Sequence, residues 1–114
     1  MEFDIWNLEF GIYMIIYNVT VKVDPGVAEA WVYWMKAEHM PELMGTDLFI
    51  DCRLCKLLDQ DEAEGITYSA QYFCEDMEQY NLYIEQHSER LRERSNKLFG
   101  GKFIAFRTLM EVIS

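Results

Sequence analysis

The sequence has few of the residues that stiffen, cross-link or interrupt a chain. Its 114 residues include two prolines, six glycines and three cysteines. An odd number of cysteines is typical of free thiols in a reducing compartment. Cys52 and Cys55 have the spacing of a metal-binding or redox pair, but they fall in a predicted strand, where their side chains point to opposite faces. We therefore interpret them as small core residues and predict no metal site.

Basic residues are also scarce. Ten lysines and arginines stand against twenty aspartates and glutamates, which gives a net charge of −10. Nucleic acids and anionic membranes both require a basic surface, so neither is an expected partner. No apolar run is long enough to span a membrane, and the first residues lack the basic start of a signal peptide. We expect a cytoplasmic protein.

The signatures of several common enzyme classes are missing as well. The sequence contains no glycine-rich phosphate loop, no nucleophile elbow and no histidine-rich metal motif. The acidic turn at 59–64 lacks the pattern of oxygen ligands and glycine that defines an EF-hand. Whether the protein is an enzyme stays open at this point, because any catalysis would depend on residues that only the fold brings together.

Hydrophobic residues, in contrast, make up 51% of the chain, which is enough for one domain with one core. Residues 15–23 alternate apolar and polar side chains, as in a strand with one buried face. Asp24 and Pro25 then predict a helix start, with Asp24 as the N-cap. Apolar residues follow at helical spacing until Pro41 and Gly45.

The second half of the chain repeats this plan. Two predicted strands, 48–58 and 66–74, flank the acidic turn and form a hairpin. Asp76 predicts the N-cap of a second helix, with Gln79 as its capping-box partner, and a fourth strand follows at 103–113. The order βαββαβ predicts an α+β, ferredoxin-like fold, in which two helices cover one face of a four-stranded antiparallel sheet.

Alternation within each strand assigns its side chains to the two faces of this sheet. One set is almost wholly apolar and is expected to lie under the helices. The helix-facing set is predicted to be Tyr17, Val19, Val21, Ile50, Cys52, Leu54, Ile66, Tyr68, Ala70, Tyr72, Ile104, Phe106, Met110 and Val112. The opposite set is predicted to be Asn18, Thr20, Lys22, Asp51, Arg53, Cys55, Thr67, Ser69, Gln71, Phe73, Phe103, Ala105, Arg107, Leu109 and Glu111.

The opposite face mixes charged, polar and apolar side chains. A face that only meets water is usually richer in lysine and glutamate, and a core does not hold several unpaired charges. A mixed face suits a surface that packs against a second copy and encloses a polar cavity. We therefore predict a homodimer that forms a dimeric α/β barrel, with a simple exposed sheet as the alternative.

Several short segments, in the same order, resemble a small bacterial family known as a domain of unknown function, family 4286. They are IIYNVTVKVD, WMKAEHMPELM, FIDCRLCKLL, GITYSAQYFC and ERSNKLFGGKFIAFRTLMEVI. The resemblance covers residues 14–114 and implies a ferredoxin-like domain of the dimeric α/β-barrel kind, with no assigned activity. Residues 1–13 lie outside it. We interpret them as an N-terminal extension that is either not native, with Met14 as the initiator, or an arm packed on the domain.

Candidate ligand-binding residues come from the predicted open face and from the end of the first helix. Arg53 and Arg107 are expected to face the barrel cavity, where a guanidinium needs a carboxylate or an anionic ligand. Asp51 and Glu111 are possible carboxylate partners, so an ion-pair network at a dimer interface is an equal alternative. His39 is expected at the mouth of the cavity as a base or hydrogen-bond donor. The candidates are Arg53, Arg107, His39, Asn18, Gln71 and Asp51.

The architecture is also similar to that of antibiotic-biosynthesis monooxygenases, haem-degrading monooxygenases and muconolactone isomerases. In the haem-degrading proteins a helical histidine holds iron, and His87 with Asn18 and Trp31 or Trp34 are the corresponding residue types here. Nothing aligns residue by residue, so we predict no cofactor. The leading interpretation is a homodimeric barrel that binds a small polar or anionic molecule. The alternatives are a cofactor-free monooxygenase or isomerase, and a purely structural or regulatory dimer.

Overall fold

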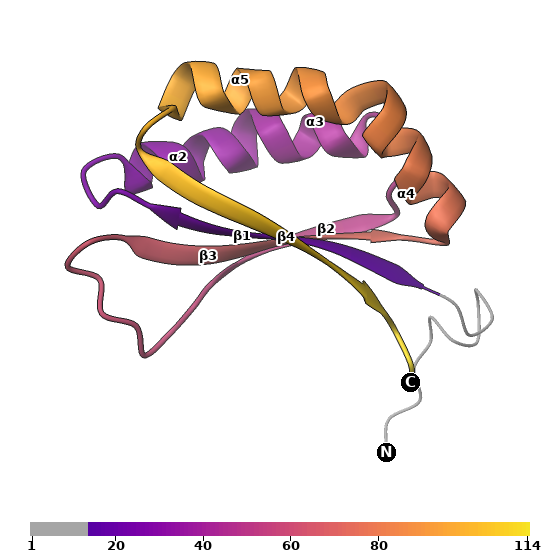
Figure 1. The fold of residues 1–114 in the computed structure, drawn as a ribbon, viewed down its shortest axis with the longest axis horizontal. Helices are drawn as coiled ribbons and strands as arrows, with labels where there is room; N and C mark the ends of the chain where they lie inside the picture. The colour runs from indigo at the N-terminus through magenta and orange to yellow at the C-terminus, as the bar shows by residue number, and fades with distance from the viewer. Residues whose placement is uncertain (1–13) are drawn as a thin grey trace.

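The structure, a computed structural model, describes residues 14–114. The predicted N-terminal extension, residues 1–13, lies outside the described residues. The described chain folds into one antiparallel sheet of four strands, with two helical rods on one face (Figure 1). This is the predicted α+β, ferredoxin-like architecture.

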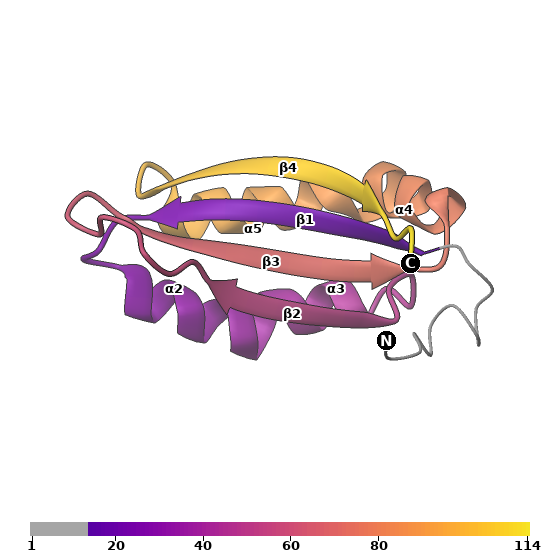
Figure 2. The ribbon, with the colours of Figure 1, turned by 90° about the horizontal axis from the view of Figure 1, so that it is seen from below.

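The sheet has the strand order β2-β3-β1-β4. The two central strands, β1 (Ile15–Val23) and β3 (Ile66–Cys74), have the predicted bounds. The edge strands are shorter than predicted: β2 spans Asp51–Lys56 and β4 spans Phe103–Glu111. Figure 2 views the sheet from the face that the helices leave uncovered.

The first helical rod begins later than the sequence predicts. Asp24 caps a turn rather than the helix, because its carboxylate accepts a hydrogen bond from the Gly26 N–H at 2.7 Å. The rod starts with α2 (Ala28–Trp34), continues through the π-helical turn η1 (Met35–His39) and ends with α3 (Met40–Met44). Pro41, near the start of α3, has no backbone N–H, and its ring crowds the carbonyl group one turn earlier in the rod. The π-helical turn η1 lies at that place, just before the proline.

The second rod consists of α4 (Met77–Tyr83), the π-helical turn η2 (Ile84–Ser88) and α5 (Glu89–Phe99). Asp76 caps it as predicted, because its carboxylate accepts a hydrogen bond from the Gln79 N–H at 3.0 Å. A π-helical turn has more residues than an α-helical turn, so it rotates the buried stripe away from the position that a uniform 3.6-residue period gives.

The strand register corrects the predicted orientation of β4. Directly opposite residues on neighbouring strands share a face of the sheet. Val19 and Val21, which face the helices, pair with Arg107 and Ala105 of β4. Every β4 side chain therefore faces the opposite way from the prediction. The helix side holds Phe103, Ala105, Arg107 and Leu109, and the open side holds Ile104, Phe106 and Met110.

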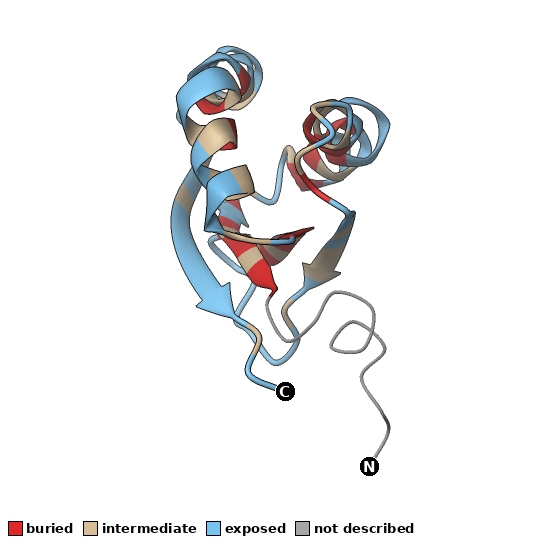
Figure 3. Ribbon diagram, turned by 90° about the vertical axis from the view of Figure 1, so that its right-hand side faces the viewer, coloured by how far each residue is buried: buried red, intermediate tan, exposed pale blue. Residues whose placement is uncertain are grey.

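The core lies between the sheet and the two rods, and it is rich in aromatic rings. The buried Tyr17 ring lies at its centre, with the rings of Phe49, Tyr72, Tyr80 and Tyr83 at centroid distances of 5.4–6.3 Å. Figure 3 shows the buried residues along the central strands and the inner sides of the rods. Burying one large apolar side chain stabilises the fold by roughly 1.5–3 kcal/mol, so this cluster holds the rods to the sheet.

Two further findings concern only residues 14–114. No helix there combines the length and the hydropathy that a membrane crossing requires. The three cysteines are free, and the same residues contain no cluster of three or more histidine, cysteine, aspartate and glutamate side chains that would hold a metal ion.

The cap of the second rod gives a test of the fold. Replacing Asp76 with alanine leaves the Gln79 N–H without its side-chain acceptor, and we expect the free energy of unfolding to fall by about 1 kcal/mol. Urea denaturation followed by circular dichroism measures this change. Glu78→Ala, which removes an exposed acidic side chain from the same first turn, is the matched control and should cost less. Equal losses in both variants would contradict a capping role for Asp76.

Candidate functional site

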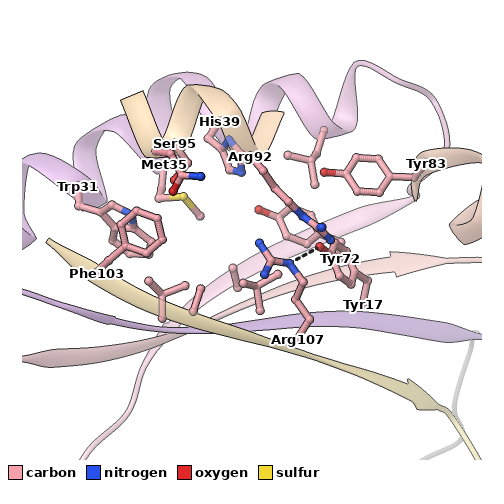
Figure 4. Close-up of a pocket in the computed structure, with 16 residues that line it drawn as sticks. Tyr17, Trp31, Met35, His39, Tyr72, Tyr83, Arg92, Ser95, Phe103 and Arg107 are labelled. Carbon is pink, nitrogen blue, oxygen red and sulfur yellow. Dashed lines mark hydrogen bonds between the residues drawn. The ribbon is translucent and has the colours of Figure 1, made fainter. Parts of the chain in front are cut away.

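A cavity of about 280 Å³ lies between the helical rods and the helix side of the sheet (Figure 4). One end is mainly apolar and is formed by Trp31, Met35 and Phe103, with Ser95 beside Met35. The middle of the cavity is polar, because His39 enters from the first rod, Arg92 from α5 and Arg107 from β4. The cavity therefore combines an apolar compartment with a small group of convergent nitrogen atoms, the usual composition of a ligand site.

Arg107 reaches this cavity because the register of β4 turns it toward the helices. Its Nε donates a hydrogen bond to the Tyr17 hydroxyl at 3.1 Å. Tyr17 is itself fixed within the buried aromatic cluster. The bond therefore positions an otherwise exposed guanidinium at the open side of the cavity, with its terminal nitrogens available to a bound molecule.

Arg92 enters the cavity from the opposite wall. Its Nε is buried and has no hydrogen-bond partner within residues 14–114. The residues that line the cavity include no aspartate or glutamate. The two ion pairs of the described residues, Lys56–Glu62 and Arg94–Glu42, involve neither Arg92 nor Arg107. Two guanidinium groups thus face one small cavity without a carboxylate.

His39 is the last residue of η1, and its imidazole points into the same space (Figure 4). The ring stacks on Trp34 with a centroid distance of 4.7 Å. Its Nδ1 is buried and has no hydrogen-bond partner in the described part of the chain. Burial, together with the positive charges of Arg107 and Arg94, lowers the pKa of His39 to about 4. The imidazole is therefore neutral at pH 7.

Two tyrosines also contribute to the polar lining. Tyr72 lies on β3 and Tyr83 ends α4, and both contribute to the cavity wall. Burial raises the pKa of Tyr72 and that of Tyr83, so both phenols stay protonated at neutral pH. The cavity therefore offers two cationic groups, one neutral imidazole and these neutral phenols, and its lining also includes the polar residues Tyr17, Ser95 and Asn96.

The structure brings together two of the six predicted ligand-binding residues, but in a different place. His39 and Arg107 were expected at the cavity between two open sheet faces, and both lie on the helix side instead. The reason is the inverted face of β4, which moves Arg107 from one side of the sheet to the other.

Arg53 and Gln71 lie on the open face, as predicted, and are opposite one another in the register. The Arg53 guanidinium lies over the ring of Phe73, 5.4 Å from its centroid, in a cation–π arrangement. The carboxylates expected to neutralise the arginines, Asp51 and Glu111, form no ion pair within the described residues. The predicted ion-pair network is therefore not formed among residues 14–114 of one chain.

Asn18 and Asp51 also lie away from the cavity. Asn18 accepts a hydrogen bond from the Ser69 hydroxyl at 2.6 Å and donates one to Thr20 at 3.1 Å, so its carboxamide is engaged within the sheet surface. The Asp51 carboxylate accepts a hydrogen bond from the Cys52 N–H at 2.8 Å.

The residues considered for haem are not brought together. His87 lies in η2, where its Nδ1 is 3.0 Å from the Arg90 guanidinium. Asn18 faces the open side of the sheet, whereas Trp31 and Trp34 lie in the core on the helix side. The sheet itself therefore separates the asparagine from the tryptophans.

Sequence reasoning missed Arg92, which was not among the six candidate ligand-binding residues. The π-helical turn η2 rotates α5 relative to α4, and Arg92 follows the fully buried Leu91 on the rotated face. A π-helical turn leaves no clear mark in the hydrophobic pattern.

Solved structures with the same fold include proteins of several kinds. A dimeric ferredoxin-like protein from an uncultured marine organism superposes with a TM-score of 0.70 at 8% identity, covering 90% of this chain and 97% of its own. A mutant of SnoaB, a cofactor-independent oxygenase from Streptomyces nogalater, gives 0.61 at 13% identity, covering 85% and 90%. The hydroxynitrile lyase from Passiflora edulis gives 0.59 at 10% identity, covering 85% and 93%. These likenesses establish the fold alone.

Comparison of the sequence itself is more specific. A search of curated proteins gives no match. The model of one protein family, described as a domain of unknown function (DUF4286), matches residues 14–113. That range agrees with the resemblance seen in the sequence and includes almost every residue of the described domain. The chain therefore belongs to the DUF4286 family, a domain of unknown function.

Proposed function

We propose that the protein binds a small organic anion in the cavity between the helical rods and the sheet. The observation that carries this proposal is the pair of guanidinium groups, Arg92 and Arg107, that enter the cavity without a carboxylate. The Nε of Arg92 is buried without a partner among the described residues, and a cation that is partly removed from water is stabilised by a counter-charge. Two planar guanidiniums match the geometry of a carboxylate, which accepts paired N–H donors.

The rest of the cavity defines the body of the ligand. Trp31, Met35 and Phe103 form an apolar compartment beside the arginines, which favours a ring or a branched hydrocarbon over a sugar or a polyamine. A cavity of about 150 Å³ is enough for one benzene molecule. The volume of about 280 Å³ therefore accommodates one substituted ring that bears the acidic group. A nucleotide is too large and too polar for this space.

Benzoate and phenylacetate are suitable first probes. Isothermal titration should show saturable binding of these acids at neutral pH and weaker binding of the uncharged benzamide. Arg107→Met preserves much of the side-chain volume but removes the charge, and we expect affinity for the acids to fall about 10- to 100-fold, as for the loss of one charge-assisted hydrogen bond worth about 1.5–3 kcal/mol.

Arg53→Met is the matched control for this experiment, because Arg53 lies on the open face of the other edge strand. It should leave the affinity unchanged. Binding of benzamide as tight as that of benzoate, or an equal loss of affinity in Arg53→Met and Arg107→Met, would show that the cavity does not recognise the negative charge.

One observation favours a second activity at the same site, a cofactor-free reaction that starts with proton abstraction. The imidazole of His39 is neutral at pH 7 and lines the cavity beside the arginines, and its Nδ1 has no hydrogen-bond partner within residues 14–114. A neutral imidazole can take a proton from a carbon or hydroxyl group of a bound acid. The guanidiniums would then stabilise the negative charge that develops on oxygen.

Phenylpyruvate tests this activity, because it is a single-ring acid with exchangeable protons beside a carbonyl. In deuterium oxide, NMR should show faster loss of its methylene protons with the protein than without it. The pKa of His39, about 4, predicts that kcat/KM stays constant from neutral pH down to about pH 5 and falls as the imidazole becomes protonated below that. His39→Gln should abolish the acceleration and keep phenylpyruvate binding. Exchange that persists in His39→Gln would exclude the imidazole as the base.

We also propose that the protein forms a homodimer through the open face of the sheet. On β4 this face carries Ile104, Phe106 and Met110, and the first two are 71% and 61% exposed. A row of exposed apolar side chains on a sheet face marks an interface more often than a solvated surface. The likeness to a protein described as dimeric supports the same arrangement.

A charge placed in this row should disrupt the dimer. Size-exclusion chromatography with light scattering is expected to give a dimer for the native sequence at micromolar concentration and a monomer for Phe106→Glu. Tyr33→Glu is the matched control, because Tyr33 is 72% exposed but lies on α2 on the other side of the molecule. It should stay dimeric. A native protein that elutes as a monomer would contradict the proposal directly.

A further inference from the structure

A second cavity, of about 590 Å³, lies along the edge strand β2. One wall is the outer side of the first helical rod, and the other is β2 with Tyr68 of β3 behind it. It shares no lining residue with the cavity described above. We call this second cavity the β2 groove. The first rod separates it from the inner cavity, because Trp31, Met35 and His39 face the inner cavity. The residues that follow each of these three in the sequence line the β2 groove. Its helical residues are Val32, Lys36, Met40, Pro41 and Met44.

The backbone of β2 is open for pairing on the side away from β3. The Leu57 N–H donates to the Thr67 carbonyl directly opposite it, at 2.9 Å, so the odd-numbered residues of β2 make the hydrogen-bonded pairs with β3. The N–H and C=O groups of the even-numbered residues, Cys52, Leu54 and Lys56, therefore point outward from the edge. The Asp51 carboxylate accepts the Cys52 N–H, which leaves the outward groups of Leu54 and Lys56 for another strand.

The side chains around this edge define what would pair with it. The floor of the groove is apolar and contains two methionines, Met40 and Met44, whose flexible side chains adapt to different partners. Lys36 lies on the helical wall, and Lys56 lies on the strand. Arg53 of β2 also borders the groove, but its guanidinium lies on the open face over Phe73, so cations stand on both sides of this edge. Among residues 14–114, no acidic residue lines the groove. Lys56 forms an exposed ion pair with Glu62, and the same pairing is available to an incoming carboxylate.

Charge complementarity therefore selects the occupant. The chain has only ten basic residues against twenty acidic ones, and three of the ten border this edge, Lys36 and Lys56 on its groove side and Arg53 on its open side. We propose that the β2 groove binds an extended, acidic peptide segment of a partner protein, which adds to β2 as a further strand. Its backbone bonds to Leu54 and Lys56, and its side chains alternate between the two sides of the edge. On the groove side, apolar side chains contact the methionine floor and carboxylates meet Lys36 and Lys56. On the open side, carboxylates meet Arg53.

The proposal is tested with a capped, fluorescein-labelled peptide slightly longer than β2. Valine and glutamate alternate at its groove-facing positions, and glutamate fills the positions between them. Fluorescence anisotropy at low salt should show saturable binding to the native protein. The same peptide with lysine in place of glutamate should not bind. Lys36→Glu reverses a charge on an exposed helical position and is expected to weaken binding about tenfold or more. Lys97→Glu, an equal charge reversal at an exposed site on α5, should have no effect.

Backbone methylation separates strand addition from simple charge attraction. Two further peptides carry N-methyl groups on alternate residues, one on the odd amides and one on the even amides. Only one set faces β2 in an added strand, so one peptide should lose binding and the other should keep it. Amide NMR shifts confined to β2 and the outer side of the first rod should accompany binding.

Three results would overturn the proposal. They are no saturable binding by the native protein, equal binding by the two methylated peptides, and equal affinities of Lys36→Glu and Lys97→Glu. Displacement of the peptide by rising protein concentration would also overturn it, because that result would assign the groove to a second copy of this chain. The inner cavity uses other residues, so failure here leaves the proposed anion binding intact.

Discussion

The hydrogen bond from Arg107 to Tyr17 connects the buried aromatic core of this protein to its candidate ligand-binding cavity. Tyr17 belongs to the aromatic cluster that holds the helical rods on the sheet, and Arg107 belongs to the polar centre of the cavity. Without that bond, an arginine on an edge strand would extend into water, as long cationic side chains usually do. The bond restrains one nitrogen and leaves the rest of the guanidinium free. The cavity therefore has a positioned cation because the core supplies a fixed hydroxyl.

The two π-helical turns place the remaining polar groups. His39 ends η1, and Arg92 follows η2 by one helical turn. Each turn rotates the residues after it relative to those before it, so a rod that begins with its apolar stripe inward presents a polar side chain inward further along. Because the turns occur in both rods, the histidine and the arginine meet the same space from opposite walls. The site thus depends on helix irregularity as much as on side-chain chemistry.

The sequence alone predicts the order of elements, the bounds of β1 and β3 and the cap at Asp76, because each rests on a local pattern. It fails for β4, where apolar side chains occupy both parities: Ile104 and Phe106 alternate with Phe103 and Ala105. Alternation cannot choose between two apolar faces, and the choice is made by the pairing with β1. That single ambiguity moved Arg107 to the wrong side of the sheet. Arg92 was missed for a related reason, since the rotation of α5 is a property of backbone hydrogen bonding that the residue pattern does not record.

The acidity of the chain limits how either proposed site can work. A net charge of −10 repels an anion at long range, but at physiological salt that repulsion is screened beyond about 8 Å. An anionic ligand therefore gains its affinity only after it has come within contact distance of the few cations. In the inner cavity Arg92 is half-buried and Arg107 is exposed, so salt weakens their attraction for an anion only in part. In the β2 groove both lysines are exposed, so salt weakens their attraction strongly. The same scarcity of basic residues thus produces two sites that differ in their sensitivity to ionic strength.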